Sequence, residues 1–188
     1  DLWHQNSGGI LGVSETGDRF GSALAAGDFD NDGRDDLAVG VPGEDIGTIR
    51  NAGAVNVIYG SARGLTHFSD DLWHQNSRGI LHASEVGDQF GWVLATGDFD
   101  NDGRDDLAVG VPGEDIGTIR NAGAVNVIYG SATGLTSVGD DVWHQNSGGI
   151  LGVSETGDSF GAALAAGDFD NDGRDDLAVG VPGEDIGT

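Results

Sequence analysis

The 188-residue chain contains no cysteine and no lysine, and it has only three prolines. Without cysteine it can form no disulfide, no thiolate metal site and no thiol nucleophile. No stretch reaches the roughly 18 consecutive apolar residues that a membrane helix needs, so membrane insertion is not expected. The first residues, 1–4, also lack the charged and apolar regions of a secretion signal.

Positive charge is scarce as well. Eight arginines stand against 32 acidic residues, which gives a formal net charge of −24. A surface of this sign repels nucleic acid and anionic membranes, so neither is expected as a partner. Hydrophobic residues make up 37% of the chain and glycines number 35. This composition can build the core of one ordinary domain that is rich in turns.

What the chain has in abundance is repetition. Residues 71–140 differ from residues 1–70 at 12 positions, and residues 141–188 differ from residues 1–48 at only three. The unit of the fold is therefore a 70-residue repeat, present as residues 1–70, residues 71–140 and an incomplete copy at 141–188. Such near-identity indicates a recent duplication, or a designed or consensus array.

One nine-residue segment, Asp-Phe-Asp-Asn-Asp-Gly-Arg-Asp-Asp, occurs unchanged at residues 28–36, 98–106 and 168–176. Carboxylates at places one, three and five, with glycine at place six, suit a loop that surrounds a hard cation with oxygen atoms at about 2.3 to 2.6 Å. These loops hold fifteen of the 32 acids, so three Ca²⁺ ions would change the formal charge from −24 to −18. Without a cation, the like charges would repel one another. We expect one Ca²⁺ per repeat, three per chain.

The EF-hand loop begins with the same spacing, but it needs a bidentate glutamate at place twelve and a helix on each side. Place twelve here is Val39, Val109 or Val179. The apolar run at residues 37–41 predicts a buried strand instead. A hairpin loop between two strands is therefore predicted, closed by the carboxylate at place nine. Asp35 should point the other way, since side chains alternate along a strand.

The predicted ligands in each loop are four aspartate side chains and the backbone carbonyl of one arginine. Mg²⁺ should compete poorly, because it demands near-ideal octahedral geometry and dehydrates reluctantly. The predicted ligand residues are Asp28, Asp30, Asp32, Arg34 and Asp36; Asp98, Asp100, Asp102, Arg104 and Asp106; and Asp168, Asp170, Asp172, Arg174 and Asp176.

Each unit contains four short extended runs separated by turn residues. In the first unit these are residues 20–26, 36–41 and 54–59 and a run around residues 72–75. No segment shows a helical period. Four strands per repeat without a helix is the pattern of a β-propeller blade. We therefore predict an all-β fold of four-stranded antiparallel blades, about 2.7 of them in a chain of this length.

Four motifs recur in a fixed order: Phe20-Gly21, the D-x-D-x-D-G-x-x-D loop, the Gly-x-Pro at residues 40–42, and Gly-Ala-Val at residues 53–55. This combination resembles the FG-GAP repeat, a family that forms the β-propeller of integrin α subunits and occurs in many bacterial secreted proteins. The resemblance implies that the calcium hairpin joins the first and second strands of each blade. It also implies a binding role. Family propellers close with about seven blades, more than this chain contains.

By this template the chain opens on a fourth strand near residues 2–5 and stops after a second strand, at Thr188. Such an arrangement leaves sheet edges unpaired. The apolar side chains of the end blades should then need partners: Leu37, Val39, Val55, Val57 and Ile58. We expect a fragment of a longer repeat protein or, as a second choice, a ring-like homo-oligomer.

Two further groups of residues invite a functional interpretation. The Trp-His-Gln-Asn clusters at residues 3–6, 73–76 and 143–146 could bind sugars, but an indole packed between blades with its N–H satisfied nearby is the favoured interpretation. The histidines lack a second histidine or cysteine at ligand spacing, so no transition-metal site is expected. The carboxylate pairs at residues 15/18 and 44/45 recur in every unit, whereas a glycosidase needs its two carboxylates in different environments. No enzyme is expected.

The sequence thus predicts a calcium-binding, non-catalytic propeller module for extracellular adhesion or ligand binding, with a protein or glycan as its ligand. Two alternatives stay open: a multivalent carbohydrate-binding lectin, and an accessory domain of a secreted hydrolase. An extracellular or cell-surface location is predicted, because loops of this kind are usually filled where calcium is plentiful.

Overall fold

A computed structural model describes residues 2–185 of the chain. These residues form strands joined by turns, and no helix among them could span a membrane. Blade 1 contains β1 (Ala23–Gly27), β2 (Asp36–Val41), β3 (Ala54–Tyr59) and β4 (Thr66–Trp73). Blade 2 contains β5 (Val93–Gly97), β6 (Asp106–Val111), β7 (Ala124–Tyr129) and β8 (Thr136–Trp143). Half-blade 3 contains β9 (Ala163–Gly167) and β10 (Asp176–Gly180).

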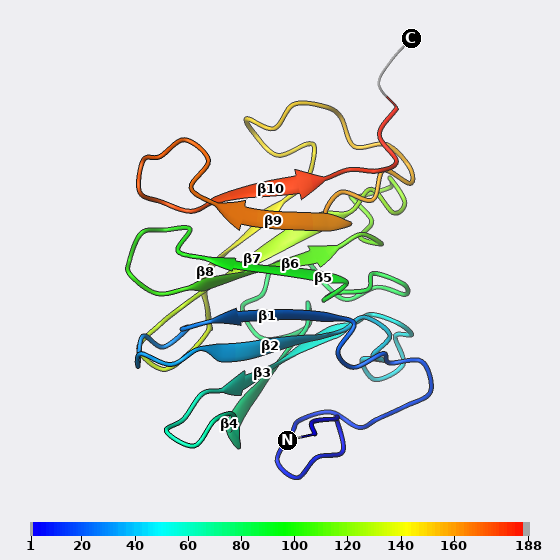
Figure 1. The fold of residues 1–188 in the computed structure, drawn as a ribbon. Helices are drawn as coiled ribbons and strands as arrows, with labels where there is room; N and C mark the ends of the chain where they lie inside the picture. Colours follow the sequence, from blue (N-terminus) through cyan, green and yellow to red (C-terminus); the bar gives the residue numbers. More distant parts are fainter. Residues whose placement is uncertain (1, 186–188) are drawn as a thin grey trace.

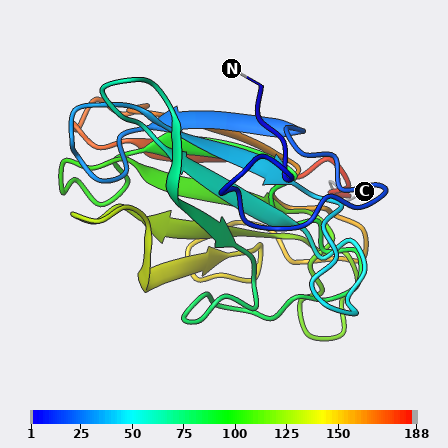
Figure 2. The same ribbon diagram turned by 90° about the horizontal axis from the view of Figure 1, so that it is seen from below.

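The strands of each sheet are antiparallel and follow one another in chain order. Figure 1 shows the three sheets stacked face to face, with half-blade 3 farthest from the N-terminus. The first strands β1, β5 and β9 lie beside one another through the stack. Figure 2 shows the same sheets from below, lying over one another. The predicted all-β class and four-stranded blade architecture are confirmed.

The strand boundaries agree with the sequence where the side chains are apolar and depart from it elsewhere. The runs at residues 36–41 and 54–59 form β2 and β3 as predicted. β1 begins at Ala23 rather than at residue 20, because the chain turns there: Arg19 and Gly21 have φ angles of 60° and 86°. β4 begins at Thr66, well before the predicted run around residues 72–75, and ends at Trp73, inside that run.

The predicted leading strand near residues 2–5 is wrong. These residues are coil and turn. In blade 1 a fourth strand exists because β3 provides its hydrogen-bonding partner, and no described segment provides a third strand beside residues 2–5. The predicted end after a second strand, at Thr188, lies outside the described residues.

Alternation along the strands gives each sheet two apolar faces. Toward blade 2, blade 1 presents Ala38, Val55 and Val57, which share one core cluster with Val109 and Ile128. Blade 2 presents its other face to half-blade 3, where the core cluster is smaller. Because inward and outward residues alternate, every sheet in the stack can pack on both sides.

The outer face of blade 1 is covered by the chain itself. Val39 and Ile58 cluster there with Ile10, and Trp3 and Phe20 pack against this cluster. The sequence led us to expect that these blade residues would need partners from outside the chain. Instead, the segment before β1 folds back over them and buries Val39 and Ile58 almost completely.

The Phe-Gly motif joins each blade to the one before it. Phe90 is fully buried, and its N–H donates to the carbonyl of Ala52 at 2.9 Å. One residue on, the carbonyl of Gly91 comes so near to Gly40 that a Cβ on Gly40 would lie 2.2 Å from the oxygen. The two blades can approach this closely only because position 40 has no side chain.

We predict that Gly40→Ala destabilises the fold, because the backbone oxygen of Gly91 cannot move aside as a side chain could. The expected loss is about 1–3 kcal/mol, the usual cost of overpacking. The matched control is Gly180→Ala. Both positions have an alanine Cβ near 3.1–3.2 Å, but no following blade stands against Gly180 in residues 2–185. Urea unfolding should show a lower midpoint for Gly40→Ala alone; equal midpoints would contradict the packing argument.

Candidate metal sites

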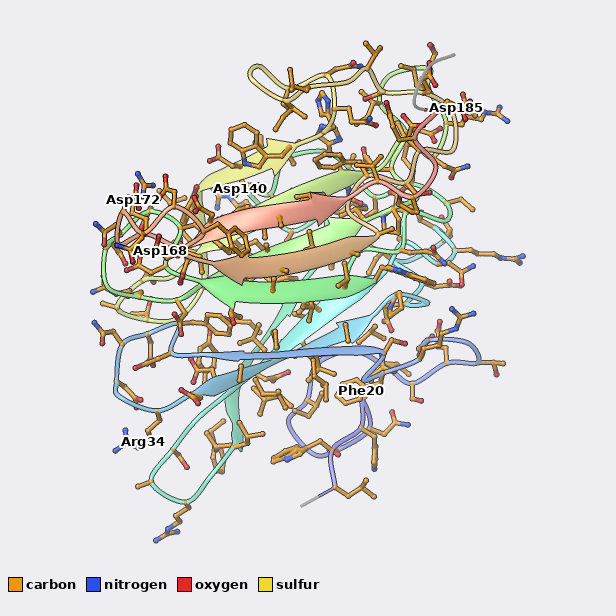
Figure 3. The ribbon with its side chains drawn as sticks, turned by 45° about the horizontal axis from the view of Figure 1, so that its top comes forward. Phe20, Arg34, Asp140, Asp168, Asp172 and Asp185 are labelled. Carbon is orange, nitrogen blue, oxygen red and sulfur yellow. The ribbon has the colours of Figure 1, made fainter. Side chains whose placement is uncertain are left out.

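The three repeated loops connect the first two strands of each blade. In the first loop, Gly27 and Asp36 form the last strand pair before the chain turns. The turn uses left-handed backbone at Asn31 and Gly33, with φ angles of 55° and 86°. Figure 3 shows Asp168 and Asp172 on the same side of the stack as Arg34, so the loops lie along one edge of the molecule.

Backbone N–H groups inside each loop hold its first carboxylates in place. In the first loop, Asp28 accepts through Oδ1 from Asp32 N at 2.9 Å and through Oδ2 from Gly33 N at 2.8 Å. Asp30 Oδ1 accepts from Asp32 N at 3.0 Å. The same three hydrogen bonds recur in the other two loops. The backbone of each loop is thus wrapped around its first two carboxylates.

Each loop brings together three of its four predicted aspartates. One carboxylate oxygen from each lies within 4.8 Å of the others. The fourth aspartate of each loop is not in that group. Each of the four predicted places contributes to the group in at least one loop, but no loop groups all four. The groups are Asp28, Asp30 and Asp32; Asp98, Asp100 and Asp106; and Asp168, Asp170 and Asp176.

The closing aspartate is tied to two backbone donors and is buried. Asp36 accepts from Phe29 N at 3.1 Å and from Gly60 N at 2.8 Å. Burial raises the pKa of Asp36 to about 6 and the pKa of the equivalent Asp106 to about 7, although the two N–H donors oppose the rise. The neighbouring carboxylates of each loop raise these pKa values further.

Among the described residues, the positively charged side chains that pair with loop aspartates are arginines of the same loops. Arg34 Nη1 lies 2.6 Å from Asp32 Oδ2, and Arg104 Nη1 lies 2.8 Å from Asp102 Oδ2. The remaining donors are all oxygens, as a hard cation requires, so the residues present fit Ca²⁺. That the carbonyl of Arg34 completes the ligand set stays a prediction.

The aspartate at place eight supports the loop of the preceding blade. Asp105 Oδ2 accepts from Asp28 N at 2.8 Å, and Asp175 Oδ2 accepts from Asp98 N at 3.0 Å. The prediction that this side chain points away from its own loop is confirmed at these two positions. Its partner could not be read from the sequence, because the contact depends on how the blades stack. Each of the first two loops is therefore fixed by residues of two blades.

The tryptophan of the second repeated cluster has a structural role. Trp73 lies on β4 and packs against the core between blades 1 and 2. Its buried Nε1–H has no acceptor within residues 2–185, contrary to the expectation that a partner lies nearby. The equivalent Trp143 is 38% exposed. For the second cluster, the placement of Trp73 favours the packing interpretation over sugar binding.

The carboxylates proposed as enzyme candidates are held by structural partners. Glu44 is buried, and Gln5 Nε2 donates to its Oε2 at 2.6 Å. Burial raises the pKa of Glu44 to about 7. Asp18 Oδ2 accepts from Glu15 N at 2.5 Å, which closes a local turn. Both contacts fix the path of loops between strands, and they recur in the second and third repeats.

One polar cluster, around His82, was not predicted from the sequence. His82 Nδ1 lies 2.5 Å from Oε1 of the buried Glu114, and this hydrogen bond raises the pKa of His82. The rings of His82 and His144 are 6.4 Å apart. Repeats 1 and 3 have glycine at the place of His82, whose φ angle of 69° is unusual for a residue with a side chain. That single substitution was the only sequence signal of the cluster.

The stacked, four-stranded antiparallel sheets with an acidic loop after each first strand define a β-propeller repeat protein. The FG-GAP repeat pattern matches residues 20–58, 90–128 and 160–188, and the chain belongs to the FG-GAP repeat family. Phosphatidylinositol-glycan-specific phospholipase D of Rattus norvegicus is 35% identical over 164 residues, which cover 87% of this chain and 18% of that protein. Integrin alpha-3 of Cricetulus griseus is 33% identical over 193 residues, 95% of this chain and 16% of that protein. The chain thus spans less than a fifth of these relatives.

We predict that Glu44 makes the fold less stable as the pH rises. Its pKa in the folded chain, about 7, lies above the roughly 4.3 of an unfolded glutamate. The folded state therefore binds the proton more tightly, and stability is lost as the pH rises from about 4 through 7. Glu44→Gln should weaken this pH dependence of the melting temperature, while Glu155→Gln, which changes an exposed glutamate of the third repeat that is not among the charges acting on Glu44, should leave the contribution of Glu44 in place. Identical pH profiles for both variants would refute the assignment.

Proposed function

We propose that the chain is a calcium-stabilised, non-catalytic propeller module that supports adhesion or ligand binding outside the cell. The observation behind this proposal is the grouping of three aspartate oxygens within 4.8 Å in every loop. Nine aspartates from three separate loops repeat this arrangement, and the loop backbone already points its N–H groups at the first and second carboxylates. One cation per loop would offset the repulsion within each group.

Ca²⁺ is the cation that suits these loops best. The ligands are hard carboxylate oxygens, and the loops lie partly exposed at one edge of the stack. Ca²⁺ accepts six to eight oxygen ligands in a flexible geometry, whereas Mg²⁺ keeps its own water molecules and a strict octahedron. A site in which the third and fourth aspartates differ in their distance to the group is easier for the larger ion to use.

Similarity to known proteins supports the proposed binding role and location. Similarity to integrin alpha-3 supports a module that contacts other molecules at the cell surface. Calcium loops of moderate affinity are usually filled outside the cell, where calcium is abundant. A protein or a glycan would serve as ligand.

Similarity to phosphatidylinositol-glycan-specific phospholipase D favours a second candidate, an accessory domain of a secreted hydrolase. In that case the repeats would position an enzyme without taking part in the reaction. Joining the chain to its neighbouring domains and comparing ligand binding with turnover separates the two roles. Binding without any effect on turnover supports the adhesion module; a changed KM with unchanged kcat supports the accessory domain.

We predict that calorimetric titration with calcium finds three sites per chain. Asp30→Asn should remove the first-loop site, because it takes away one of the three grouped carboxylates. Asp35→Asn is the control, since this exposed aspartate lies in the same loop and outside the group. It should leave the number of sites unchanged. Equal stoichiometry in both variants would count against the proposed ligands.

We also predict that chelation destabilises the fold. A cation that binds only the folded loop adds RT ln(1 + [L]/Kd), about 2.7 kcal/mol per site at a hundred times Kd. EDTA should therefore lower the melting temperature. The triple variant Asp30→Asn, Asp100→Asn, Asp170→Asn provides the control, because its melting temperature should not respond to EDTA. A wild-type melting temperature unmoved by EDTA would rule out a stabilising cation.

A further inference from the structure

The positions that vary most between the repeats meet at one place on the surface. Among residues 1–48 and their equivalents, only two positions carry a different residue in every repeat. These residues are Arg19, Gln89 and Ser159 at one position, and Ser22, Trp92 and Ala162 at the other. Four of them line an open groove of about 410 Å³, the Trp92 groove, whose wall includes Gln89, Trp92, Pro112, Asn121, Ser159 and Ala162.

The Trp92 groove lies where the turns beside the first two strands of blade 2 and half-blade 3 meet. Ser159 N donates to the Asn121 carbonyl at 3.1 Å. In the same way, Gln89 N donates to the Asn51 carbonyl at 3.2 Å where blades 1 and 2 meet. The backbone that shapes the groove is therefore the same at a junction of two four-stranded blades, and no strand after β10 is needed to form it.

The groove lies at the end of the strands opposite the acidic loops. Those loops precede the second strand of each blade, whereas Pro112 and Pro182, which line the groove, follow β6 and β10. Figure 3 shows Asp185, shortly after Pro182 in the chain, on the far side of the molecule from Asp168 and Asp172. A ligand in the groove would therefore not contact the proposed calcium sites.

The chemistry of the lining suits a neutral ligand. None of the described residues that line the groove is charged, although the net charge of the chain is −24. Trp92 is 39% exposed and offers aromatic surface. Gln89 and Asn121 supply side-chain amides, and Ser159 supplies a hydroxyl. An indole can pack on the C–H face of a pyranose ring while amides donate to and accept from the ring hydroxyls.

The side chain at the first variable position is present at a cost to the backbone. Arg19, Gln89 and Ser159 have φ angles of 60°, 61° and 56°. Glycine adopts such angles most readily, and glycine stands two residues before and two residues after this position in every repeat. No repeat has glycine at the position itself. A side chain held in this strained region favours a functional role for it.

We propose that the Trp92 groove binds a neutral carbohydrate. A pyranose ring stacks on Trp92, and the amides of Gln89 and Asn121 bind its hydroxyls. Only the second repeat has tryptophan at this position, so residues 2–185 contain one such site, unlike the multivalent lectin that the Trp-His-Gln-Asn clusters would form. A proline-rich peptide fits less well, because its grooves are lined with aromatic residues and this one has a single aromatic ring. The inference rests on the proposed binding role, whose ligand class it names, and not on the calcium sites.

The test titrates the complete 188-residue protein with neutral oligosaccharides of glucose, xylose, mannose and N-acetylglucosamine by isothermal titration calorimetry. At least one of them should bind saturably, with one site per chain. Trp92→Ser introduces the residue that repeat 1 has at this position, and it should weaken that binding at least about tenfold. Gln89→Ser introduces the residue of repeat 3 and should also weaken it. No saturable binding to any of the sugars, or unchanged affinity in Trp92→Ser, would overturn the inference.

Trp143→Ala provides the matched control, because Trp143 is 38% exposed and lies outside the groove. It should leave the sugar affinity unchanged, and far-ultraviolet circular dichroism checks that each variant folds. Affinity lost in Trp143→Ala but kept in Trp92→Ser would place the sugar at the Trp-His-Gln-Asn clusters and overturn the inference. A proline-rich peptide that binds more tightly than every sugar, and is lost in Trp92→Ser, would overturn it too.

Calcium titration of the same protein separates this inference from the proposed calcium sites. Asp30→Asn should bind the sugar as tightly as the unchanged chain does, since the first loop lies at the other end of the strands. A chain that binds calcium but no sugar would refute the carbohydrate site alone. A chain that binds the sugar through Trp92 but binds no calcium would refute the calcium sites and support the groove.

Discussion

The close approach of backbone between successive blades is the constraint on which this structure depends. Gly40 and Gly91 meet so tightly that a single Cβ would not fit. This approach buries Phe90 and brings the apolar faces of blades 1 and 2 into one core. Sheets held farther apart would leave gaps between their side chains and lose the dispersion contacts that dense packing provides. The main role of the Phe-Gly motif is therefore to let successive blades pack closely.

The same stacking of blades also determines the geometry of the acidic loops. Asp105 reaches back to the backbone of Asp28, and in the first two loops a glycine that follows the third strand donates its N–H to the closing aspartate. The geometry of the first loop therefore depends on more than the loop itself: its carboxylates lie in one loop, and their supports come from the next blade and from the end of the third strand. In a chain with a net charge of −24, stacking the blades in this way also gathers the acidic loops along one edge, where their like charges repel one another.

Local patterns were enough to predict the elements that local chemistry determines. β2 and β3 are apolar, rich in β-branched residues and bounded by turns, and the spacing of aspartates marked every loop. The start of β4 at Thr66 was missed because polar residues such as Ser69 and Asp70 hide its pairing with β3, which includes a register shift. The fold-back of residues before β1 and the partner of Asp105 were also out of reach, since both depend on the packing of segments far apart in the chain.

The identity of the repeats has a consequence for how the chain folds. β3 and β7 have the same sequence, and so do β2 and β6. β7 would therefore fit the edge of β2 in the same register, with the same side-chain contacts, as β3 does. Side-chain complementarity cannot distinguish β3 from β7, so the length of the connecting loop must select the native pairing. Residues 42–53 form a much shorter loop than residues 42–123 would, and shorter loops close at lower entropic cost. Which copies of β2 and β3 pair is therefore decided by loop length and by the rate of pairing, because the competing strands are identical in sequence. A chain of this kind is prone to refold slowly through states in which strands of different repeats have exchanged places.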